Sequence, residues 1–548
     1  MRRFTTAPLI GVVLIAGCAP TPEASASPGG SDAASPPARS VPSGDTVRLT
    51  TGLLSHPHPR PHPDVRVYPG IPFASPPVGA LRWRPPEPPA AWEGVRSAAE
   101  FGPGCMQELA GSRLPWTEEF MHQGDVSEDC LYLNVWTAAE SEAESRPVLV
   151  YIHGGGFGEG SGSVAVYDGA SLAAKGLVVV TVNYRLGALG FLAHPALTAE
   201  SSHAASGNYG LLDQVAALAW VRDNIAAFGG DPGNVTIAGQ SAGAMSVYVL
   251  TASPLAAGLL HGAIVQSGPG GLASFGVRDA SVASTLAQAE SVGTAFGAAR
   301  GAESTEELRA LTVAELSPRA GAGGPPARFG PVVDGWLLPD DVPAIYAAGE
   351  QNEEPVLMGF NADEGSAFPG YGDSTPDAMR RMGEQRFGDA DRFLELYPPD
   401  EDEDGDGGNQ AKAALRDLAA VALTRLAAER AEAAETPAWL YYFERGIPWP
   451  EHPEYGAFHT GEVPYVFASL DRLERPWEPM DRDLADVMSS YWVAFAMAGD
   501  PNGPALPEWP AFDGAPRTFM VLGESIGPEP LPGDPARRAF LEAVLERP

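Results

Sequence analysis

A serine between two glycines, placed where a strand-like segment meets a helix-like one, constrains this chain more than any other feature. The segment reads Gly239-Gln-Ser241-Ala-Gly243, and the short apolar run Val235–Ala238 that precedes it is typical of a buried strand. A strand that turns at once into a helix holds the serine in a strained backbone conformation and exposes its hydroxyl. The flanking glycines let the strand and the helix approach closely. We therefore expect Ser241 to be a nucleophile.

A run of three glycines follows an earlier strand-like segment. It reads His153-Gly154-Gly155-Gly156-Phe157. Glycines leave backbone N–H groups free to point at an oxyanion, and this pattern after a strand is typical of an oxyanion loop. The N–H groups of Gly155, Gly156 and Ala242 would form the hole. The alternative is a glycine-rich turn without a catalytic role.

Strand-like and helix-like segments alternate through the first half of the chain. The expected strands are Val148–His153, Leu177–Tyr184, Val235–Ala238 and Ala263–Gln266, and the expected helix between them is Leu211–Phe228. This alternation predicts an α/β fold with a parallel, doubly wound sheet. After about residue 280 the pattern becomes more helical. Asn409–Glu435, rich in alanine with interspersed charges, is expected to be a long surface helix.

Composition excludes some partners and bounds the number of domains. The 548 residues include 70 acidic and 35 basic side chains, for a formal charge of −35. Nucleic acid and anionic lipid both require a basic surface, so neither is an expected partner. Length alone would allow three or four domains. The candidate functional residues span most of the chain and must meet, so we expect one catalytic domain over residues 46–548.

The N-terminus has the pattern of an export signal. Two arginines precede the apolar run Ala7–Ala16, which is too short to span a bilayer and ends in the lipobox-like Ile15–Cys18. This pattern predicts a lipoprotein-type signal peptide over residues 1–17, a lipidated Cys18 and a flexible tether over residues 18–45. The protein would then be exported and lipid-anchored on the outer face of the cell membrane. Cleavage of an ordinary signal peptide, followed by secretion, is the alternative.

Two further cysteines, Cys105 and Cys130, complete the cysteine count of three. In an oxidising compartment two such thiols are expected to form one disulfide. Two buried free thiols are the alternative.

Several ordered motifs resemble one family. They are Tyr68–Pro77, Ser127–Trp136, Phe228–Val235, Tyr491-Trp492 and Gly499–Asn502. Together with the two glycine motifs, they make the chain similar to the type-B carboxylesterases, from about residue 47 to near the C-terminus. The resemblance implies the α/β-hydrolase fold, a central, mostly parallel twisted sheet flanked by helices, with a helical C-terminal elaboration. It also implies hydrolysis of carboxylic esters.

A serine nucleophile needs a general base, and the base in these hydrolases follows the serine and the acid in the chain. His261, His452 and His459 are the histidines after Ser241. His261 comes too soon, and His452 lies in a proline-rich stretch. His459 lies in Gly456–Phe467, which is similar to the family's histidine loop, so we predict His459 as the base.

The acid must lie between the nucleophile and the base. Gly359–Gly365 follows a strand-like segment and resembles the family segment whose glutamate is the triad acid. Glu364 is therefore the predicted acid, with Asp363 as its local rival. The resemblance also implies that Ser267 forms a hydrogen bond near the triad. Gln240, which directly precedes the nucleophile, is expected to lie beside the triad as a supporting residue as well. The predicted mechanism proceeds through an acyl-enzyme and requires no metal or cofactor.

Some features depart from the family or leave the substrate open. Cholinesterases have a glutamate where this chain has Gln240, and Trp116 lies at a different spacing from their cation-binding tryptophan, so choline esters are not favoured. The segment His56–Pro63 is expected to be an extended surface loop rather than a metal site. Asp400–Asp406 matches the start of a calcium loop, but Ala411 replaces the bidentate glutamate, so a solvated acidic loop is preferred.

Two other function classes remain. A lipase or an amidase could use the same fold, although the candidate lid between the two cysteines is of mixed polarity. A non-catalytic adhesion module is disfavoured because Ser241, Glu364 and His459 are all present. We expect a small-molecule ester as substrate and leave the oligomeric state open.

Overall fold

The computed structural model describes residues 46–55, 64–109, 111–271, 273, 282–317, 329–352, 354–399, 409–433, 436–513 and 518–546. The expected signal peptide, Cys18, the tether, His56–Pro63 and Asp400–Asp406 lie outside the described residues. Within the described residues, no helix is long and apolar enough to cross a membrane.

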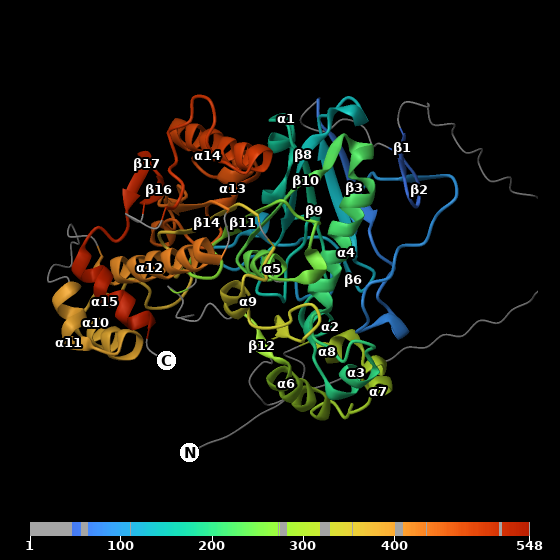
Figure 1. The fold of residues 1–548 in the computed structure, drawn as a ribbon, viewed down its shortest axis with the longest axis horizontal. Helices are drawn as coiled ribbons and strands as arrows, with labels where there is room; N and C mark the ends of the chain where they lie inside the picture. The colour runs from blue at the N-terminus through green and yellow to red at the C-terminus, as the bar shows by residue number, and fades with distance from the viewer. Residues whose placement is uncertain are drawn as a thin grey trace, which may run out of the picture. The chain divides into compact units, whose positions relative to one another are not determined.

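A large mixed sheet organises the chain from residue 66 onward (Figure 1). Among the described residues its order is β17-β16-β15-β14-β11-β10-β8-β9-β7-β3. The strands are β3 (Arg66–Pro72), β7 (Tyr132–Thr137), β8 (Arg146–Ile152), β9 (Val178–Val182), β10 (Gly230–Gln240), β11 (Gly262–Gln266), β14 (Val356–Asn361), β15 (Ala438–Phe443), β16 (Thr518–Leu522) and β17 (Ile526–Pro530). The strands from β9 to β16 pair in parallel, and antiparallel strands complete both edges. The predicted mostly parallel sheet and its four predicted strands are confirmed.

Smaller strands and helices surround this sheet. The small strands are β1 (Thr46–Leu49), β2 (Gly52–Ser55), β4 (Val95–Ser97), β5 (Gly104–Cys105), β6 (Val126–Ser127), β12 (Ser284–Thr285) and β13 (Val332–Val333). The helices are α1 (Ala170–Ala174), α2 (Gly187–Phe191), α3 (Pro195–Glu200), α4 (Tyr209–Asn224), α5 (Ala242–Thr251), α6 (Leu286–Ala298), α7 (Thr305–Ala310), α8 (Val313–Leu316), α9 (Val342–Ala348), α10 (Pro376–Met382), α11 (Ala390–Leu396), α12 (Gln410–Ala433), α13 (Val463–Val466), α14 (Pro479–Ala498) and α15 (Pro535–Leu545).

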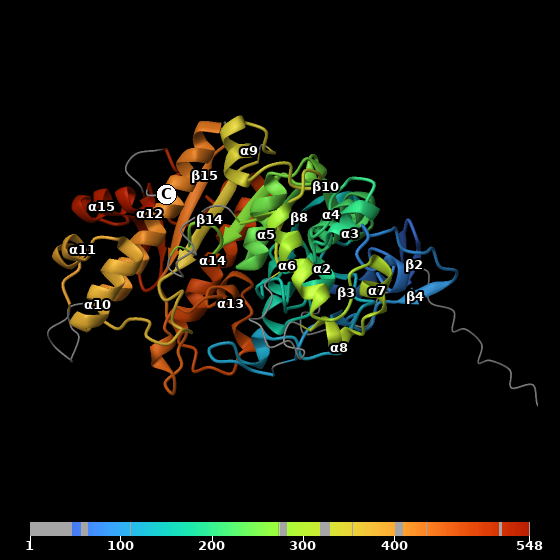
Figure 2. The same cartoon turned by 90° about the horizontal axis from the view of Figure 1, so that it is seen from below.

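Both faces of the sheet are buried, as the continuous apolar strands require. Alternate residues of β8 enter two different cores, because successive side chains of a strand point to opposite faces. Val148 and Val150 pack in the core that contains α4 and α5, whereas Leu149 and Tyr151 pack in the core that contains α14. The strands β8, β10 and β14 therefore lie between two layers of helices (Figure 2).

The helix α12 differs from its prediction as a surface helix. Its alanines and leucines pack against α15, α9, β14 and β15, and Asp417 and Thr424 on the same helix are also buried. The interspersed charges suggested exposure, but Arg430 is buried as well and pairs with the buried Glu354. Apolar and small residues cover more than one face of this helix, which is the pattern of a buried helix rather than a surface one.

Candidate active site

The nucleophile elbow has the predicted backbone. Ser241 lies between the end of β10 and the start of α5, with φ 57° and ψ −122°. A non-glycine residue with this backbone costs on the order of 1–3 kcal/mol, so the surrounding structure must enforce it. The Ser241 N–H donates to the carbonyl of Gln266 at 2.9 Å, and its carbonyl accepts from Met245 N at 2.9 Å. Ser241 is thereby held on the sharp turn that its sequence predicted.

The two glycines of the elbow are required by close packing. A Cβ at Gly243 would overlap the carbonyl oxygen of Ile152, and one at Gly239 would lie 2.5 Å from the backbone of Gly243. Neither position can carry a side chain unless β8, β10 and α5 move apart. This close approach explains the spacing of the motif.

The oxyanion loop follows β8 and faces the elbow. Gly155 and Gly156 have φ of +108° and +60°, and a Cβ at Gly155 would overlap the carbonyl of Glu159. A Cβ at Gly154 would lie 3.1 Å from that of Ser241. Gly155, Gly156 and Ser241 line one cavity, and Ala242 opens α5 directly after the nucleophile. The structure brings the predicted oxyanion residues together, and their role stays a prediction.

His153 supports this loop from inside the protein. Its Nδ1 lies 2.8 Å from the carbonyl of Gly154, its ring stacks on Tyr184, and the Tyr184 hydroxyl donates to the His153 carbonyl. Burial lowers the pKa of His153 to about 4, so it is neutral near pH 7 and donates from Nδ1.

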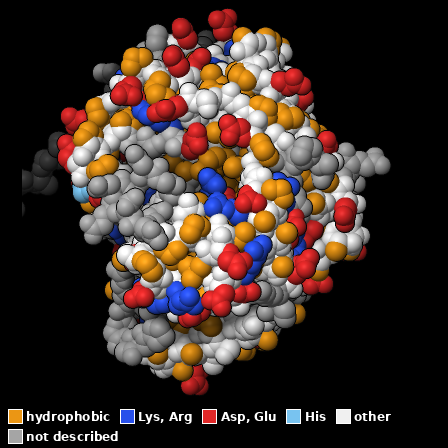
Figure 3. Space-filling view, turned by 90° about the vertical axis from the view of Figure 1, so that its left-hand side faces the viewer, with side chains coloured by type: hydrophobic (Ala, Val, Ile, Leu, Met, Phe, Trp, Pro, Cys, Tyr) orange, Lys and Arg blue, Asp and Glu red, His pale blue; other side chains and the backbone are white. Residues whose placement is uncertain are grey.

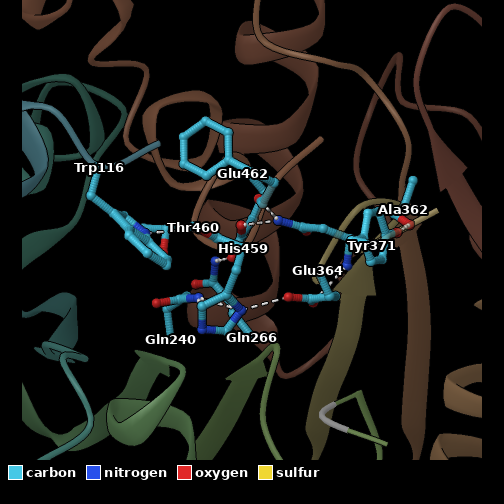
Figure 4. A network of polar contacts seen from close by, with 11 residues as sticks. Trp116, Gln240, Gln266, Ala362, Glu364, Tyr371, His459, Thr460 and Glu462 are labelled. Atoms are coloured by element: carbon cyan, nitrogen blue, oxygen red, sulfur yellow. Dashed lines mark hydrogen bonds and ion pairs between the residues drawn. The ribbon is translucent and has the colours of Figure 1, made fainter. Parts of the chain in front are cut away.

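The predicted base and acid lie side by side, although they are 95 residues apart (Figure 4). Glu364 follows β14; its Oε2 lies 2.5 Å from Nδ1 of His459, and its Oε1 accepts from Asn361 N at 2.9 Å. Both side chains are buried, Glu364 almost completely. Its rival Asp363 instead accepts from Lys412 and from Ala457 N. The structure thus brings Glu364, and not Asp363, to the histidine.

The other two candidate bases, His261 and His452, have hydrogen-bond partners outside the predicted triad. His261 Nδ1 accepts from Val235 N at the start of the sequence-predicted strand, and His452 pairs with Glu454 at the surface. His122, which precedes the nucleophile in the chain, also lines the cavity, but its ring nitrogens lie within hydrogen-bonding distance of Asp125 O and Ser163 Oγ.

Gln240 lies over the ring of His459. Its amide nitrogen is 3.2 Å from Nε2 and 3.4 Å from Nδ1. Because the two distances are nearly equal, the amide faces the imidazole plane rather than the lone pair of one nitrogen. Sequence reasoning placed Gln240 near the triad, and the structure adds this neutral contact with the base.

Trp116 reaches the same histidine despite its unusual spacing. Its Nε1 donates to His459 O at 3.0 Å and to Thr460 Oγ1 at 3.1 Å. The Arg113 guanidinium lies 5.5 Å from the centroid of the Trp116 ring and also pairs with Glu159. This tryptophan therefore holds the histidine loop and already has a cation beside its ring.

A second buried carboxyl, Glu462, was missed by sequence reasoning. It accepts from Asn361 Nδ2 at 2.6 Å and from Gln266 Nε2 at 3.1 Å, and it is fully buried (Figure 4). Burial, reinforced by the charge of Glu364, raises the pKa of Glu462 to about 7. The available signal was an acidic residue at the start of the otherwise apolar run Val463–Phe467.

Ser267 is close to this network in sequence but makes no hydrogen bond to it. Its φ is 51°, its N–H donates to Gly359 O at 2.8 Å, and its buried hydroxyl has no partner in the described part of the chain. The hydrogen bond that the resemblance implied is therefore not seen, and a supporting role for Ser267 stays a prediction.

The cavity over Ser241 has a volume of about 550 Å³. Cys105 and Cys130 form the predicted disulfide, and the loop between them supplies Trp116, Phe120 and Met121 to the wall. Phe368, which is 55 % exposed, lies on the opposite loop and also lines the cavity. Most of the lining area is apolar, Glu108, Arg113 and Glu159 are its charged groups, and the predicted nucleophile and base, Ser241 and His459, both reach it.

Comparison with known proteins agrees with this geometry. Residues 47–528 match the model of the carboxylesterase family. The chain is 41 % identical over 489 residues to the fumonisin B1 esterase of Sphingopyxis macrogoltabida, covering 85 % of this chain and 84 % of the relative. It is 36 % identical to the para-nitrobenzyl esterase of Bacillus subtilis strain 168, covering 84 % and 92 % of the two chains.

Solved structures show the same fold. A carboxylesterase of Geobacillus stearothermophilus matches with a TM-score of 0.72 and 34 % identity, covering 92 % of this chain and all of that one. This likeness confirms the α/β-hydrolase fold. With the family match over most of the chain and several esterases among its relatives, the protein belongs to the carboxylesterase family and is a carboxylic ester hydrolase.

Proposed function

We propose that this protein cleaves small-molecule carboxylic esters through a Ser241–His459–Glu364 triad and an acyl-enzyme. The observation that carries the proposal is the Glu364–His459 contact at 2.5 Å, beside a cavity that His459 and the strained Ser241 line together. Ser241 follows β10, Glu364 follows β14, and His459 lies in the loop between β15 and α13, so their meeting is not a consequence of local sequence. Such a constellation is recognised by geometry and roles rather than by position in the chain.

The proposed reaction follows from these positions. His459 takes the proton of Ser241 Oγ as the oxygen attacks the ester carbonyl. The N–H groups of Gly155, Gly156 and Ala242 stabilise the oxyanion of the tetrahedral intermediate. His459 then protonates the leaving alcohol, and a water molecule hydrolyses the acyl-enzyme by the same steps. Glu364 holds the Nδ1–H tautomer and stabilises the imidazolium.

The cavity favours a bulky organic ester over a cationic one. Drug-sized ligands occupy pockets of roughly 300–1,000 Å³, and this cavity falls within that range. Two relatives are named for esters of fumonisin B1 and of a para-nitrobenzyl group, which supports a bulky acyl or alcohol part here as well. Gln240 contributes no negative charge beside the base, and Arg113 already lies at the Trp116 ring. Both features disfavour a choline ester.

A lipase is the second candidate, and the loop between the cysteines argues against it. A lid that opens at a lipid surface must move as a unit. Here the disulfide closes the loop, and Trp116 donates to the backbone of the catalytic histidine. The loop is therefore part of the active-site wall. An amidase on the same fold uses the same residues and has to be separated from an esterase by assay.

The test compares wild type, Ser241→Ala and the control Ser490→Ala, a serine on α14, with p-nitrophenyl acetate and butyrate. We expect Ser241→Ala to lower kcat by at least about 10⁴-fold, as removal of triad nucleophiles does, with Ser490→Ala unchanged. Equal rates for wild type and Ser241→Ala would refute the assignment. Parallel assays with long triacylglycerols and anilides separate the esterase from a lipase and an amidase.

The acid is tested by a matched pair of neighbours. Glu364→Gln is expected to lower kcat by about 10⁴-fold because the amide favours the wrong histidine tautomer. Asp363→Asn makes the same chemical change one residue earlier and should cost far less. The reverse order would make Asp363 the acid.

We also propose that the protein is exported and anchored by a lipid on Cys18. The arginine pair, the short apolar run and the lipobox-like pattern support this proposal, and the disulfide is consistent with an oxidising compartment. Labelling with a radioactive fatty acid should mark the wild type and leave Cys18→Ala unmarked. Label that persists in the variant would exclude Cys18 as the site.

A further inference from the structure

Asp363, the neighbour of the proposed triad acid, links two loops and a helix. Its N–H donates to Ala457 O at 3.0 Å, and its Oδ2 accepts from Ala457 N at 3.0 Å. Both the backbone and the side chain of Asp363 are therefore hydrogen-bonded to the histidine loop. Its Oδ1 accepts from Lys412 Nζ at 2.6 Å. The loop that carries Glu364 (residues 362–371, the acid loop) is thereby joined to the loop of His459 and to α12 through one side chain.

The histidine loop is shaped to receive this carboxylate. Gly456 has φ 54°, and a Cβ at that position would overlap Oδ2 of Asp363. The glycine therefore serves the close approach of the carboxylate as well as the turn. A parallel bridge between Asp363 and Phe458 continues the contact to the residue before His459.

Lys412 is equally constrained on its own side. It lies in the first turn of α12, where Asn409 Oδ1 accepts from its backbone N–H at 2.9 Å. Its Nζ lies 5.2 Å from the centroid of the Tyr371 ring, and the Tyr371 hydroxyl donates to Ala362 O at 3.1 Å. Lys412 thus contacts both ends of the segment that carries Glu364.

The side chain of Asp363 is 14 % exposed and that of Lys412 is 35 % exposed, so the ion pair is only partly screened by solvent. The chain contains only one other lysine, Lys175. It pairs with the exposed Asp486 on α14 and provides a matched control.

We propose that Lys412 and Asp363 form a positioning pair that holds the acid loop against the histidine loop. Because the two side chains carry opposite charges, their electrostatic effects on the Glu364–His459 contact largely cancel. This inference rests on the triad proposed above. It assigns no contact with the substrate to either residue. The contact at 2.5 Å depends on two segments 95 residues apart. Asp363 joins these segments through its hydrogen bonds with Ala457, and Lys412 holds the Asp363 carboxylate from α12. A displacement of about 1 Å at a catalytic contact can cost up to 100-fold in rate.

Several titratable and charged groups surround the pair and enter its electrostatics. They are Glu364 and Tyr371 on the acid loop, Tyr442 on β15 and Glu444 directly after it, Arg416 and Asp417 on α12, and His459 and Glu462 on the histidine loop. The three carboxylates Asp363, Glu364 and Glu462 lie in this neighbourhood. Loss of Lys412 would leave them with less compensating positive charge.

The experiment uses Lys412→Met, Asp363→Asn, Lys412→Arg and the control Lys175→Met in the full-length enzyme. For Lys412→Met and Asp363→Asn we expect kcat to fall about fivefold to tenfold, with KM within about twofold, because the geometry of the triad changes and not the binding of substrate. Lys412→Arg should recover most of the activity, and Lys175→Met should match wild type.

The pH profile supplies a readout that a merely structural role would not move. Without Lys412 the negative charge of Asp363 is uncompensated and favours the imidazolium of His459, so the acidic limb of kcat/KM moves to higher pH. Without the charge of Asp363, Lys412 disfavours the imidazolium, and the limb moves to lower pH. Shifts of about 0.3 to 1 pH unit in opposite directions are expected, because both charges lie close to the protein surface and are partly screened by solvent.

Each result decides between the two proposals. Wild-type kcat and pH profile in both variants, or limb shifts in the same direction, would overturn the positioning pair while leaving an inactive Ser241→Ala as support for the triad. An active Ser241→Ala would overturn the triad itself. If Lys412→Met does not fold, Lys412→Gln and Asp363→Asn carry the same opposed shifts and decide the question.

Discussion

His459, the proposed base, has a neutral amide over its ring and a carboxylate at its edge. The amide of Gln240 is a dipole without net charge, so it supports the imidazole without strongly favouring the imidazolium. Glu364 supplies the negative charge, from the side of Nδ1. The negative charge beside this imidazole therefore comes from Glu364 and not from Gln240.

Gln240→Glu is predicted to shift the pH profile. A carboxylate in place of the amide lies against the ring and favours the imidazolium. As the pH is lowered, His459 is therefore protonated, and stops acting as a base, already at a higher pH than in wild type. The acidic limb of kcat/KM for p-nitrophenyl butyrate should move up by about 1 unit. The variant should also improve KM for a cationic ester relative to a neutral one. An unchanged limb would show that position 240 does not contact the histidine.

Glu462 is predicted to make stability depend on pH. Its pKa of about 7 in the folded protein lies above the value of 4.5 for an exposed glutamate, because burial disfavours its charge. Below about pH 4.5 the carboxyl is protonated in both the folded and the unfolded protein, so its contribution to the free energy of unfolding is at its most favourable. As pH rises toward 7 that contribution is lost, and above 7 the ionised group disfavours folding by on the order of 3 kcal/mol.

Glu462→Gln removes this titration. The stability of the variant, compared with wild type at the same pH, should therefore be higher at pH 8.5 than at pH 5. The measurement is the melting temperature of both proteins at the two pH values. Any constant cost of the amide cancels in the difference. A difference that stays the same, or that shrinks toward high pH, would contradict a raised pKa at this position.

At the scale of elements, the site forms where strand ends meet. The oxyanion loop follows β8, Ser241 follows β10, Gln266 ends β11, and Glu364 follows β14. These strands are neighbours in the order β14-β11-β10-β8, so their carboxyl ends lie along one edge of the sheet. Open parallel sheets bind ligands at this edge because all the loops emerge there.

The loop closed by the disulfide is the second element of the site. Loss of the disulfide bond should lower the stability of the protein and also weaken substrate binding. Cys105 and Cys130 close a loop with a sequence separation of 25, which contributes about 3 kcal/mol in the chain-entropy model. The Cys105→Ser/Cys130→Ser protein should melt at a lower temperature and show a higher KM, because Trp116 and Phe120 on this loop line the cavity.

Wild type under mild reduction, with thiols blocked by iodoacetamide, serves as the comparison for this variant. Both preparations should show the same direction of change. Loss of stability without any change in KM would mean that the loop keeps its place at the cavity without the covalent link.

At the scale of the whole molecule, acidic side chains dominate the charge. The formal charge is −35, and Figure 3 shows acidic groups spread over one face with fewer basic ones among them. Several of the arginines are not free surface charges. Arg185 and Arg430, for example, are buried in ion pairs with Asp213 and Glu354.

This excess charge predicts stabilisation by salt. Self-repulsion among the acidic groups destabilises the folded state, and the Debye length falls from about 30 Å at 0.01 M to about 8 Å at 0.15 M. The melting temperature should therefore rise by a few degrees when sodium chloride is added over this range at pH 8. Chloride is preferred to sulfate because sulfate stabilises proteins by exclusion from their surface. A flat or falling melting temperature would show that the surface charges are already balanced locally.

The parts of the site that sequence reasoning predicted are those whose backbone is determined locally. Ser241 and its two glycines, and the glycines after β8, were recognisable because a strand that turns directly into a helix, or into an N–H-lined loop, requires those residue types. The order of serine, acid and histidine then narrowed the base to His459. The four strands β8, β9, β10 and β11 and the helix α4 also followed from the apolar pattern of the sequence.

Other features depended on contacts between distant segments. Nothing local distinguishes Glu364 from Asp363, which are adjacent carboxylates; only the packing of the acid loop against the histidine loop turns one to His459 and the other to Lys412. The burial of α12 was mispredicted for the same reason, because its charges find partners on other elements.

The sequence by itself thus predicted the fold class, the turn that carries Ser241 and the glycine loops around it, since short-range sterics and hydrophobic periodicity act within a few residues. Only the tertiary structure showed that Glu364 contacts His459 while Asp363 contacts Lys412, that Glu462 is buried beside them, and that a neutral amide covers the ring. Those outcomes depend on side chains brought together by strand order from positions about 100 to 220 residues apart, where no local pattern operates.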